Sequence, residues 1–157
     1  MAHMADEAIR VVARGVVRRN GANRDPALSE NGTELLVARE RDADGEPFYC
    51  PLGGGVEFGE RSADALRREF DEELGVSLAD ATYRETYESV FTHGGERHHE
   101  LWRTYDVVVA ASWPYERDAF PAYEPDLDEQ MRCEWKPVDA FVDGDETLYP
   151  AALLDDR

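Results

Sequence analysis

Three glutamates, Glu69, Glu72 and Glu73, stand at the spacing i, i+3 and i+4. On a helix their carboxylates share one side, apart from the apolar stripe of the same segment. Carboxylates this close repel one another by a few tenths of a kcal/mol per pair, and by more when they are partly buried. A hard divalent cation such as Mg²⁺ or the neighbouring Arg68 would compensate. Taken alone, the spacing also describes a solvated face of an acidic helix.

Several glycines precede these acids: Gly53, Gly54, Gly55 and Gly59. They predict a flexible loop in which backbone groups approach a ligand, an arrangement suited to phosphates and to a metal-binding carbonyl. A helix follows, with Ser62 as the expected cap at its start and Gly75 at its end. The sequence therefore predicts a glycine loop that runs into one acidic helix.

The segment from Gly54 to Val76 resembles the Nudix box, written G-x5-E-x7-R-E-U-x-E-E-x-G-U, where U is a bulky apolar residue. Phe70 departs mildly from the pattern, because the first U position is usually aliphatic. The matching residues are Gly54, Glu60, Arg68, Glu69, Glu72, Glu73, Gly75 and Val76.

This resemblance implies a hydrolase that cleaves a diphosphate linkage in a nucleoside diphosphate joined to another group, with Mg²⁺ or Mn²⁺ as cofactor. It implies that the metal is held by Glu69, Glu72, Glu73 and the Gly54 carbonyl. Arg68 would orient the glutamates, and Glu60 would support the loop or the helix. The base that activates water would be Glu72 or a residue outside the box such as Glu100, for which a further metal ligand or a surface glutamate are the alternatives.

The chain has 157 residues and a net charge of −18, from 35 acidic against 17 basic residues. A charge of this sign makes nucleic-acid polymers and anionic membranes poor partners. An anionic nucleotide would need bound metal and local arginines to enter. A basic rim for its phosphates could come from Arg10, Arg14, Arg18 and Arg39, although a strand arginine is also often simply solvated. The backbones of Gly53 and Gly55 are further candidates for binding the substrate.

Cys50 and Cys133 form no C-x-x-C pattern. They suit a reducing cytoplasm as buried thiols, with a disulfide as the alternative. We expect no membrane span and no signal peptide, because no apolar run approaches about 20 residues. We also expect Met1 to Met4 to come from a cloning remnant, with the natural start at Met4.

Strands are predicted on both sides of the helix, and a hairpin is expected around His93 to Gly95. The predicted strands are Ala8 to Arg19, Thr33 to Arg39, Pro47 to Leu52, Thr82 to Phe91, Glu100 to Ala111 and Arg132 to Pro137. The first two strands should pair antiparallel, across a loop from Asn20 to Asn31. A proline- and acid-rich surface loop is expected from Trp113 to Asp128, with short helices at Val138 to Phe141 and Leu148 to Leu154.

These elements fit the α/β class as one domain over residues 1–157, an α/β/α sandwich with a mixed sheet, which is also the fold that the Nudix resemblance implies. The substrate stays open between a nucleotide sugar, a nucleoside triphosphate and a dinucleotide. A non-catalytic nucleotide sensor is the alternative function, and an isomerase built on the same box is a further one. The resemblance also suggests a homodimer.

Overall fold

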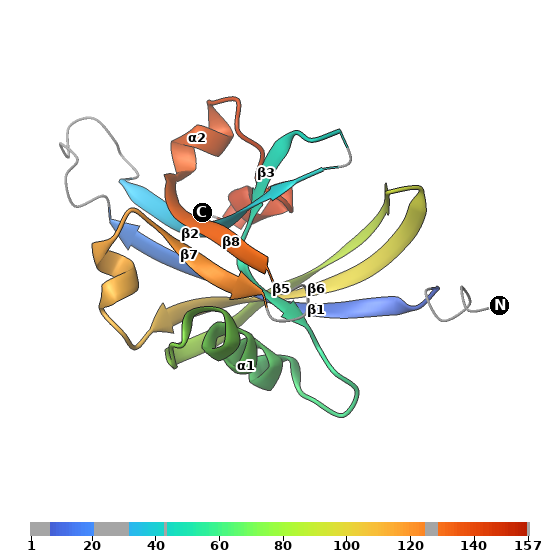
Figure 1. Cartoon of the computed structure of the whole chain (residues 1–157), viewed down its shortest axis with the longest axis horizontal. Coiled ribbons are helices and arrows are strands. Elements are labelled where there is room, and N and C mark those ends of the chain that lie inside the picture. Colours follow the sequence, from blue (N-terminus) through green and yellow to red (C-terminus); the bar gives the residue numbers. More distant parts are fainter. Residues whose placement is uncertain (1–6, 21–31, 43, 125–128, 157) are drawn as a thin grey trace.

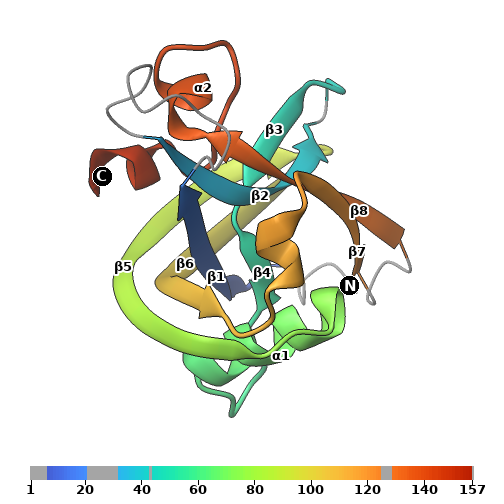
Figure 2. The same cartoon turned by 90° about the vertical axis from the view of Figure 1, so that its left-hand side faces the viewer.

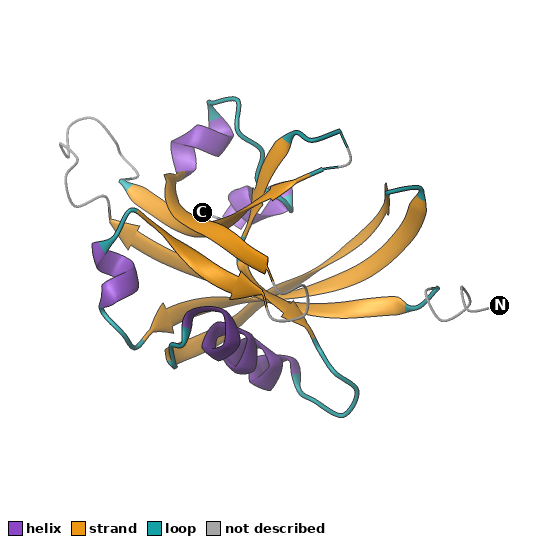
Figure 3. Ribbon diagram, in the orientation of Figure 1, coloured by secondary structure: helices purple, strands orange, loops and turns teal. Residues whose placement is uncertain are grey.

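The computed structural model describes residues 7–20, 32–42, 44–124 and 129–156 (Figure 1). Its elements follow one another in this order: β1 (Ile9–Asn20), β2 (Thr33–Arg41), β3 (Pro47–Cys50), β4 (Leu52–Gly55), α1 (Ser62–Leu74), β5 (Leu78–His93), β6 (Glu96–Val109), η2 (Trp113–Glu116), β7 (Ala119–Glu124), β8 (Glu129–Pro137), α2 (Val138–Val142) and η3 (Ala151–Asp156). The two η elements are 3-10 helices. Figure 3 shows how far strands outweigh helices in the described residues.

β1 occupies the middle of the sheet, where its run of valines is buried. The strand order is β5-β6-β1-β2-β8-β7, with β3 added beside β2 and β4 beside β1. β1 pairs parallel with β6 over Ile9 to Val17, whereas the other strand pairs are antiparallel. The sheet is therefore mixed, as predicted. β5 curves along one side of the molecule (Figure 2).

Helices cover both sides of this sheet, with α1 on one side and α2 with η3 on the other (Figure 1). Under α1, Leu66 and Phe70 pack into one core cluster. Under α2, Phe141 joins a second cluster with Leu35 and Val37 of β2. The predicted α/β/α sandwich is confirmed, because each helical layer buries an apolar stripe against its own face of the sheet.

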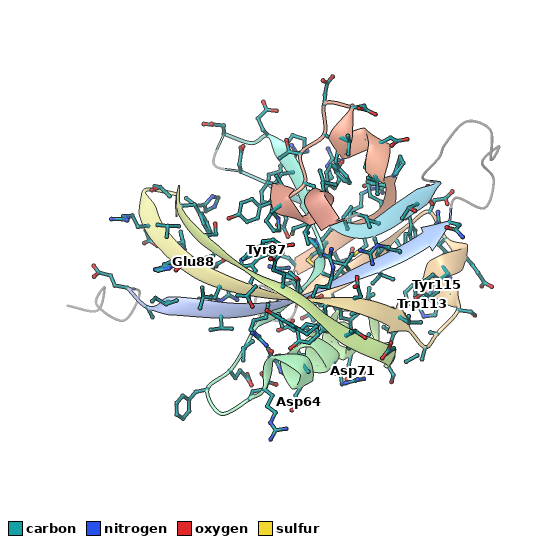
Figure 4. All side chains as sticks on the ribbon, turned by 180° about the vertical axis from the view of Figure 1, so that it is seen from behind. Asp64, Asp71, Tyr87, Glu88, Trp113 and Tyr115 are labelled. Atoms are coloured by element: carbon teal, nitrogen blue, oxygen red, sulfur yellow. The ribbon has the colours of Figure 1, made fainter. Side chains whose placement is uncertain are left out.

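α1 ends where it was predicted to end, at Gly75, which takes the left-handed conformation with φ of 68° and donates its N–H to the Asp71 carbonyl. Its start differs by one residue. Arg61 is the N-cap and makes no side-chain cap bond, while the Ser62 hydroxyl instead bonds the Tyr105 hydroxyl. Asp64 and Asp71 are exposed at the outer side of α1 (Figure 4).

The predicted surface loop from Trp113 to Asp128 was wrong in part, because it contains η2 and β7. Phe120 and Ala122 of β7 are buried in the core cluster that also contains Leu66 and Phe70 of α1. Pro121 is tolerated because β7 lies at the edge of the sheet, where one side of the strand needs no hydrogen-bond partners. The last part of the predicted loop, residues 125–128, lies outside the described residues.

The predicted hairpin is confirmed as β5 and β6, joined by Gly94 and Gly95 at φ of 63° and 81°. The antiparallel pairing of β1 with β2 is also confirmed, over Arg18 to Asn20. Most of the loop predicted between them lies outside the described residues. A helix predicted at Leu148 begins instead at Ala151, because Leu148 forms a bridge with Tyr49 of β3.

Both cysteines are free and buried, which confirms the prediction of thiols. Cys50 and Cys133 are the register partners of Ala38 on opposite sides of β2. Two strand spacings, about 10 Å, therefore separate their backbones, which is too far for a disulfide. No helix among the described residues is long and apolar enough to cross a membrane.

Candidate metal centre and substrate cavities

Glu69 and Glu73 lie on the buried side of α1, and each is only 4% exposed. They are one helical turn apart, next to the apolar residues that face the sheet. Glu72 is exposed on the adjoining side of the helix. The three glutamates that the sequence grouped together are thus divided into a buried pair and one solvent-facing neighbour.

A third buried-side carboxylate, from Glu124 at the end of β7, joins this pair. Oxygen atoms of Glu69, Glu73 and Glu124 all lie within 4.8 Å of one another. Glu124 was not predicted as a site residue, because Pro121 and the acids of this segment give β7 the composition of a loop. Only the register of β7 on β8 brings this residue over α1.

Burial makes the charge of this cluster costly. It raises the pKa of Glu73 to about 9, with a further contribution from repulsion by Glu69 and Glu124 that Arg14 partly offsets. The pKa of Glu69 is also raised by burial, against the opposing effect of Arg68. Neither carboxylate oxygen of Glu73 has a hydrogen-bond donor among the described residues. Such acceptors fit a hard divalent cation, which removes the repulsion and satisfies the oxygens together.

Three of the glycines before α1, Gly53, Gly54 and Gly55, lie in strand β4 instead of the predicted loop, since Leu52–Gly55 pairs antiparallel with β1. Gly59 lies in a turn between β4 and α1, with φ of 84°. Glycine is required here for close approach. A β-carbon on Gly54 would lie 2.5 Å from Cδ of Glu69. Gly53 has φ of 146°, and a β-carbon there would lie 1.9 Å from the Ala13 carbonyl oxygen. Because Gly54 has no side chain, the Glu69 carboxylate can rest against the β4 backbone, and Gly53 in turn lets β4 lie close to β1.

Arg68 connects the helix to the segment that precedes it. Its Nε and Nη2 donate to the two carboxylate oxygens of Glu60 at 2.9 and 3.1 Å. Nη2 also donates to the Gly55 carbonyl at 3.0 Å. From the same guanidinium, Nη1 reaches Glu69 at 3.2 Å and Glu72 at 3.3 Å. Hydrogen bonding to Arg68 lowers the pKa of Glu60. These contacts are compatible with the predicted role of Arg68 in orienting the glutamates, which stays a prediction.

Arg14 of β1 supports the other side of β4. Its Nη1 donates to the carbonyls of Pro51 and Gly53 at 3.1 and 3.3 Å. Its guanidinium carbon lies 4.6 Å from the centre of the Trp102 ring. The positive charge of Arg14 opposes the rise in the pKa of Glu73. Arg14 therefore holds the glycine strand and supplies compensating charge below the cluster.

Two cavities contain the predicted site residues Arg10, Glu100 and Arg39 in their walls. The larger, about 770 Å³, is lined by Arg10, Glu100 and Glu60 among others. The smaller, about 340 Å³, is lined by Arg39 together with Glu124 of the cluster. Arg10 and Arg39 are thus placed in separate cavities.

Glu100 is buried in the wall of the larger cavity, outside the group of three carboxylates. It accepts a hydrogen bond from Trp102 Nε1 at 2.7 Å and a longer one from Arg10 at 3.4 Å. Gly55 lies beside this pair, because a β-carbon there would be 2.9 Å from a nitrogen of Arg10. Roles for Arg10, Arg39, Glu100 and Gly55 stay predictions.

The chain is similar in sequence to proteins of a known family. The NUDIX domain family profile matches residues 10–155. A nucleoside triphosphatase NudI from Klebsiella pneumoniae is 45% identical over 53 residues, which is 34% of this chain and 38% of that protein. The same enzyme from Escherichia fergusonii is 48% identical over 54 residues, again 34% and 38%. These alignments span about two fifths of the length of the curated relatives.

Among solved structures, a MutT NUDIX hydrolase from Burkholderia pseudomallei superposes with a TM-score of 0.58 at 19% identity, over 94% of this chain and 96% of that one. At this identity the likeness concerns the fold. The mixed sheet, the helix α1 and the family profile over nearly all of the chain agree, and the chain belongs to the NUDIX domain family.

Proposed function

We propose that this protein is a metal-dependent pyrophosphohydrolase that cleaves the diphosphate linkage of a nucleoside diphosphate joined to another group. The observation that carries the proposal is Glu73, whose two buried carboxylate oxygens have no donor among the described residues. Buried oxygens without a hydrogen-bond donor lower the stability of the folded protein unless a bound ligand interacts with them. Its neighbours in the cluster, Glu69 and Glu124, offer further carboxylate oxygens as metal ligands.

Mg²⁺ or Mn²⁺ would be held by Glu69, Glu73 and Glu124, with the Gly54 carbonyl as a further ligand. When bound, such a cation neutralises charge on phosphate oxygens and lowers the pKa of water. Glu72 was also expected as a ligand. It is exposed and bonded to Arg68, so we assign it a role in proton transfer instead.

In the proposed reaction, the oxygen of water forms a bond to one phosphorus of the diphosphate. The bridging P–O bond breaks, and the leaving phosphate keeps the electron pair. The proton of the attacking water passes to a carboxylate, for which we propose Glu72, because Arg68 holds it beside Glu69. Arg68 keeps both carboxylates in place and is therefore a positioning residue.

The assignment of the base is tested by comparing Glu72→Gln with Glu100→Gln. If Glu72 accepts the proton, its replacement lowers kcat by about a hundredfold or more and removes the acidic limb of the pH profile. The Glu100→Gln variant should keep that limb. The reverse pattern would move the role to Glu100.

For the substrate, a nucleoside triphosphate and a nucleotide sugar are the favoured classes. The names of the two curated relatives support the triphosphate, although the identity extends over only about a third of this chain. A basic rim for phosphates would come from Arg39 in the cavity that Glu124 also lines. The free, buried state of Cys50 and Cys133 supports the predicted cytoplasmic location.

The function is tested by incubating the protein with a panel of nucleoside triphosphates, nucleotide sugars and dinucleotides in Mg²⁺ or Mn²⁺. Chromatography then resolves the nucleoside monophosphate, inorganic phosphate and pyrophosphate released. We expect cleavage between phosphates in at least one class, and its loss in Glu73→Gln. Tight nucleotide binding without turnover would contradict the proposal and favour the sensor. Size-exclusion chromatography with light scattering tests the expected homodimer in the same samples.

A further inference from the structure

The larger cavity is the main concave feature that the metal centre does not use. None of Glu69, Glu73 and Glu124 lines it. Its volume of about 770 Å³ lies within the range of pockets that hold small organic ligands. It is formed between the start of β1, the first half of β6 and the segment that joins β4 to α1.

One wall of this cavity is apolar and unusually exposed. The Phe58 ring is fully exposed, and Ile9 is 58% exposed. Val56 also lines the cavity. Exposed aromatic and aliphatic groups at the mouth of a pocket lose water favourably when a flat apolar ring covers them. This wall suits a heterocyclic base.

The other walls carry groups that can hydrogen-bond such a base. Arg103 donates to the hydroxyls of Ser62 and Thr86 at 3.1 and 3.2 Å, and among the described residues it forms no ion pair. Its guanidinium charge is therefore not neutralised by a carboxylate among the described residues, in a cavity that it lines. Glu100 adds a buried carboxylate acceptor, and Arg10 adds a second guanidinium whose side chain is 57% exposed. Donors and an acceptor therefore converge beside an apolar surface.

The cavity is also connected to the metal centre through one side chain. Glu60 lines the cavity and binds Arg68 through both of its oxygens. The same Arg68 reaches Glu69 of the metal centre. One guanidinium therefore separates the cavity wall from the cluster, a gap that the sugar and phosphates of a nucleotide can span.

We propose that this cavity binds the nucleoside part of the substrate, with the base against Phe58 and Ile9 and with Arg10, Arg103 and Glu100 on its polar edges. The inference rests on the proposed function, since it names where the base of that substrate lies. Phe58 is then a specificity residue at the mouth of the cavity, and Glu100 is a binding residue.

The test measures binding of reaction products in the absence of metal, so that turnover plays no part. Isothermal titration calorimetry with EDTA compares GMP and AMP with ribose 5-phosphate and inorganic phosphate. We expect at least one of the two nucleotides to bind about tenfold or more tightly than ribose 5-phosphate. Phe58→Ala and Ile9→Ser should each reduce that preference, Phe58→Ala by about tenfold, which is the size of a lost base–aromatic stack.

Both replaced side chains are exposed, so the variants should keep the fold, which circular dichroism checks. Val142→Ala is the matched control, because Val142 is also exposed but belongs to α2. Equal binding of ribose 5-phosphate and the nucleotides, no binding of any probe, or an unchanged preference in Phe58→Ala would each overturn the inference. If hydrolysis is nevertheless observed with Mg²⁺, the proposed function stands without it. Base-selective binding without hydrolysis would support the nucleoside cavity and contradict the proposed function.

Discussion

Replacing Glu73 by glutamine should stabilise the metal-free protein while abolishing its turnover. The ordinary pKa of a glutamate is 4.5, and burial raises that of Glu73 to about 9. Between these values the unfolded chain has released a proton that the folded protein retains. Stability must therefore fall as pH rises through this window, by about 1.4 kcal/mol per pH unit for one group.

At pH 7 this loss is roughly 3 to 4 kcal/mol, because two and a half pH units of the window have been crossed. Glutamine has nearly the shape of the protonated acid and never ionises, so the variant should avoid the loss. The Glu73→Gln variant also lacks a metal ligand, and we therefore expect its turnover to fall at least about a hundredfold. A gain in stability joined to a loss of activity marks a residue retained for its ligand.

The assay is urea unfolding in EDTA at several pH values from 5 to 8, with the free energy of unfolding taken by linear extrapolation. Wild type should lose stability with rising pH more steeply than Glu73→Gln. Glu72→Gln is the matched control, since it removes a carboxylate from the neighbouring exposed position and should keep the wild-type slope. Identical slopes in all three proteins would refute the reasoning. Added Mg²⁺ should then stabilise wild type more than Glu73→Gln.

Three further results are expected. Arg68→Lys keeps the charge but loses the pair of hydrogen bonds to Glu60, so kcat should fall at least about tenfold while KM changes little. A change in KM as large as the change in kcat would argue against a positioning role. Gly54→Ala places a methyl group 2.5 Å from Cδ of Glu69 and should weaken Mn²⁺ binding in calorimetry by about tenfold or more, whereas Gly32→Ala, with nothing within 4 Å, should not. Chelation should abolish hydrolysis, and Mg²⁺ or Mn²⁺ should restore it; activity that survives in EDTA would exclude the metal requirement.

Local patterns made the helix predictable. Its cap at Gly75 and its apolar stripe through Leu66 and Phe70 are encoded within a few turns of sequence. Valine-rich runs likewise identified the strands. The parallel pairing of β1 with β6 joins residues about ninety positions apart, and no local pattern reports it. Elements that are determined by neighbouring residues could therefore be predicted, whereas the pairing of strands distant in the sequence could not.

For the candidate site, too, only the local part could be predicted from the sequence. Helical spacing placed Glu69 and Glu73 side by side, but it could not show that Glu72 faces solvent, because which side of a helix is buried depends on the sheet beneath it. Glu124 was missed since an edge strand can carry the prolines that usually mark a loop. Gly53 and Gly54 were expected to be mobile for ligand approach, whereas pairing with β1 fixes them and leaves the room to Glu69.

The excess of acid also constrains how a nucleotide reaches this centre. A free polyphosphate approaching a chain of net charge −18 is repelled, and two of the nearby arginines are already engaged: Arg68 with Glu60, and Arg14 with the carbonyls of β4. Neither is free to neutralise an incoming phosphate. A nucleotide that arrives with its own divalent cation carries less charge, and its metal matches the oxygens that Glu73 leaves without donors. The same carboxylates that repel the free nucleotide would then favour its metal complex, so apparent affinity should depend on the concentration of that complex.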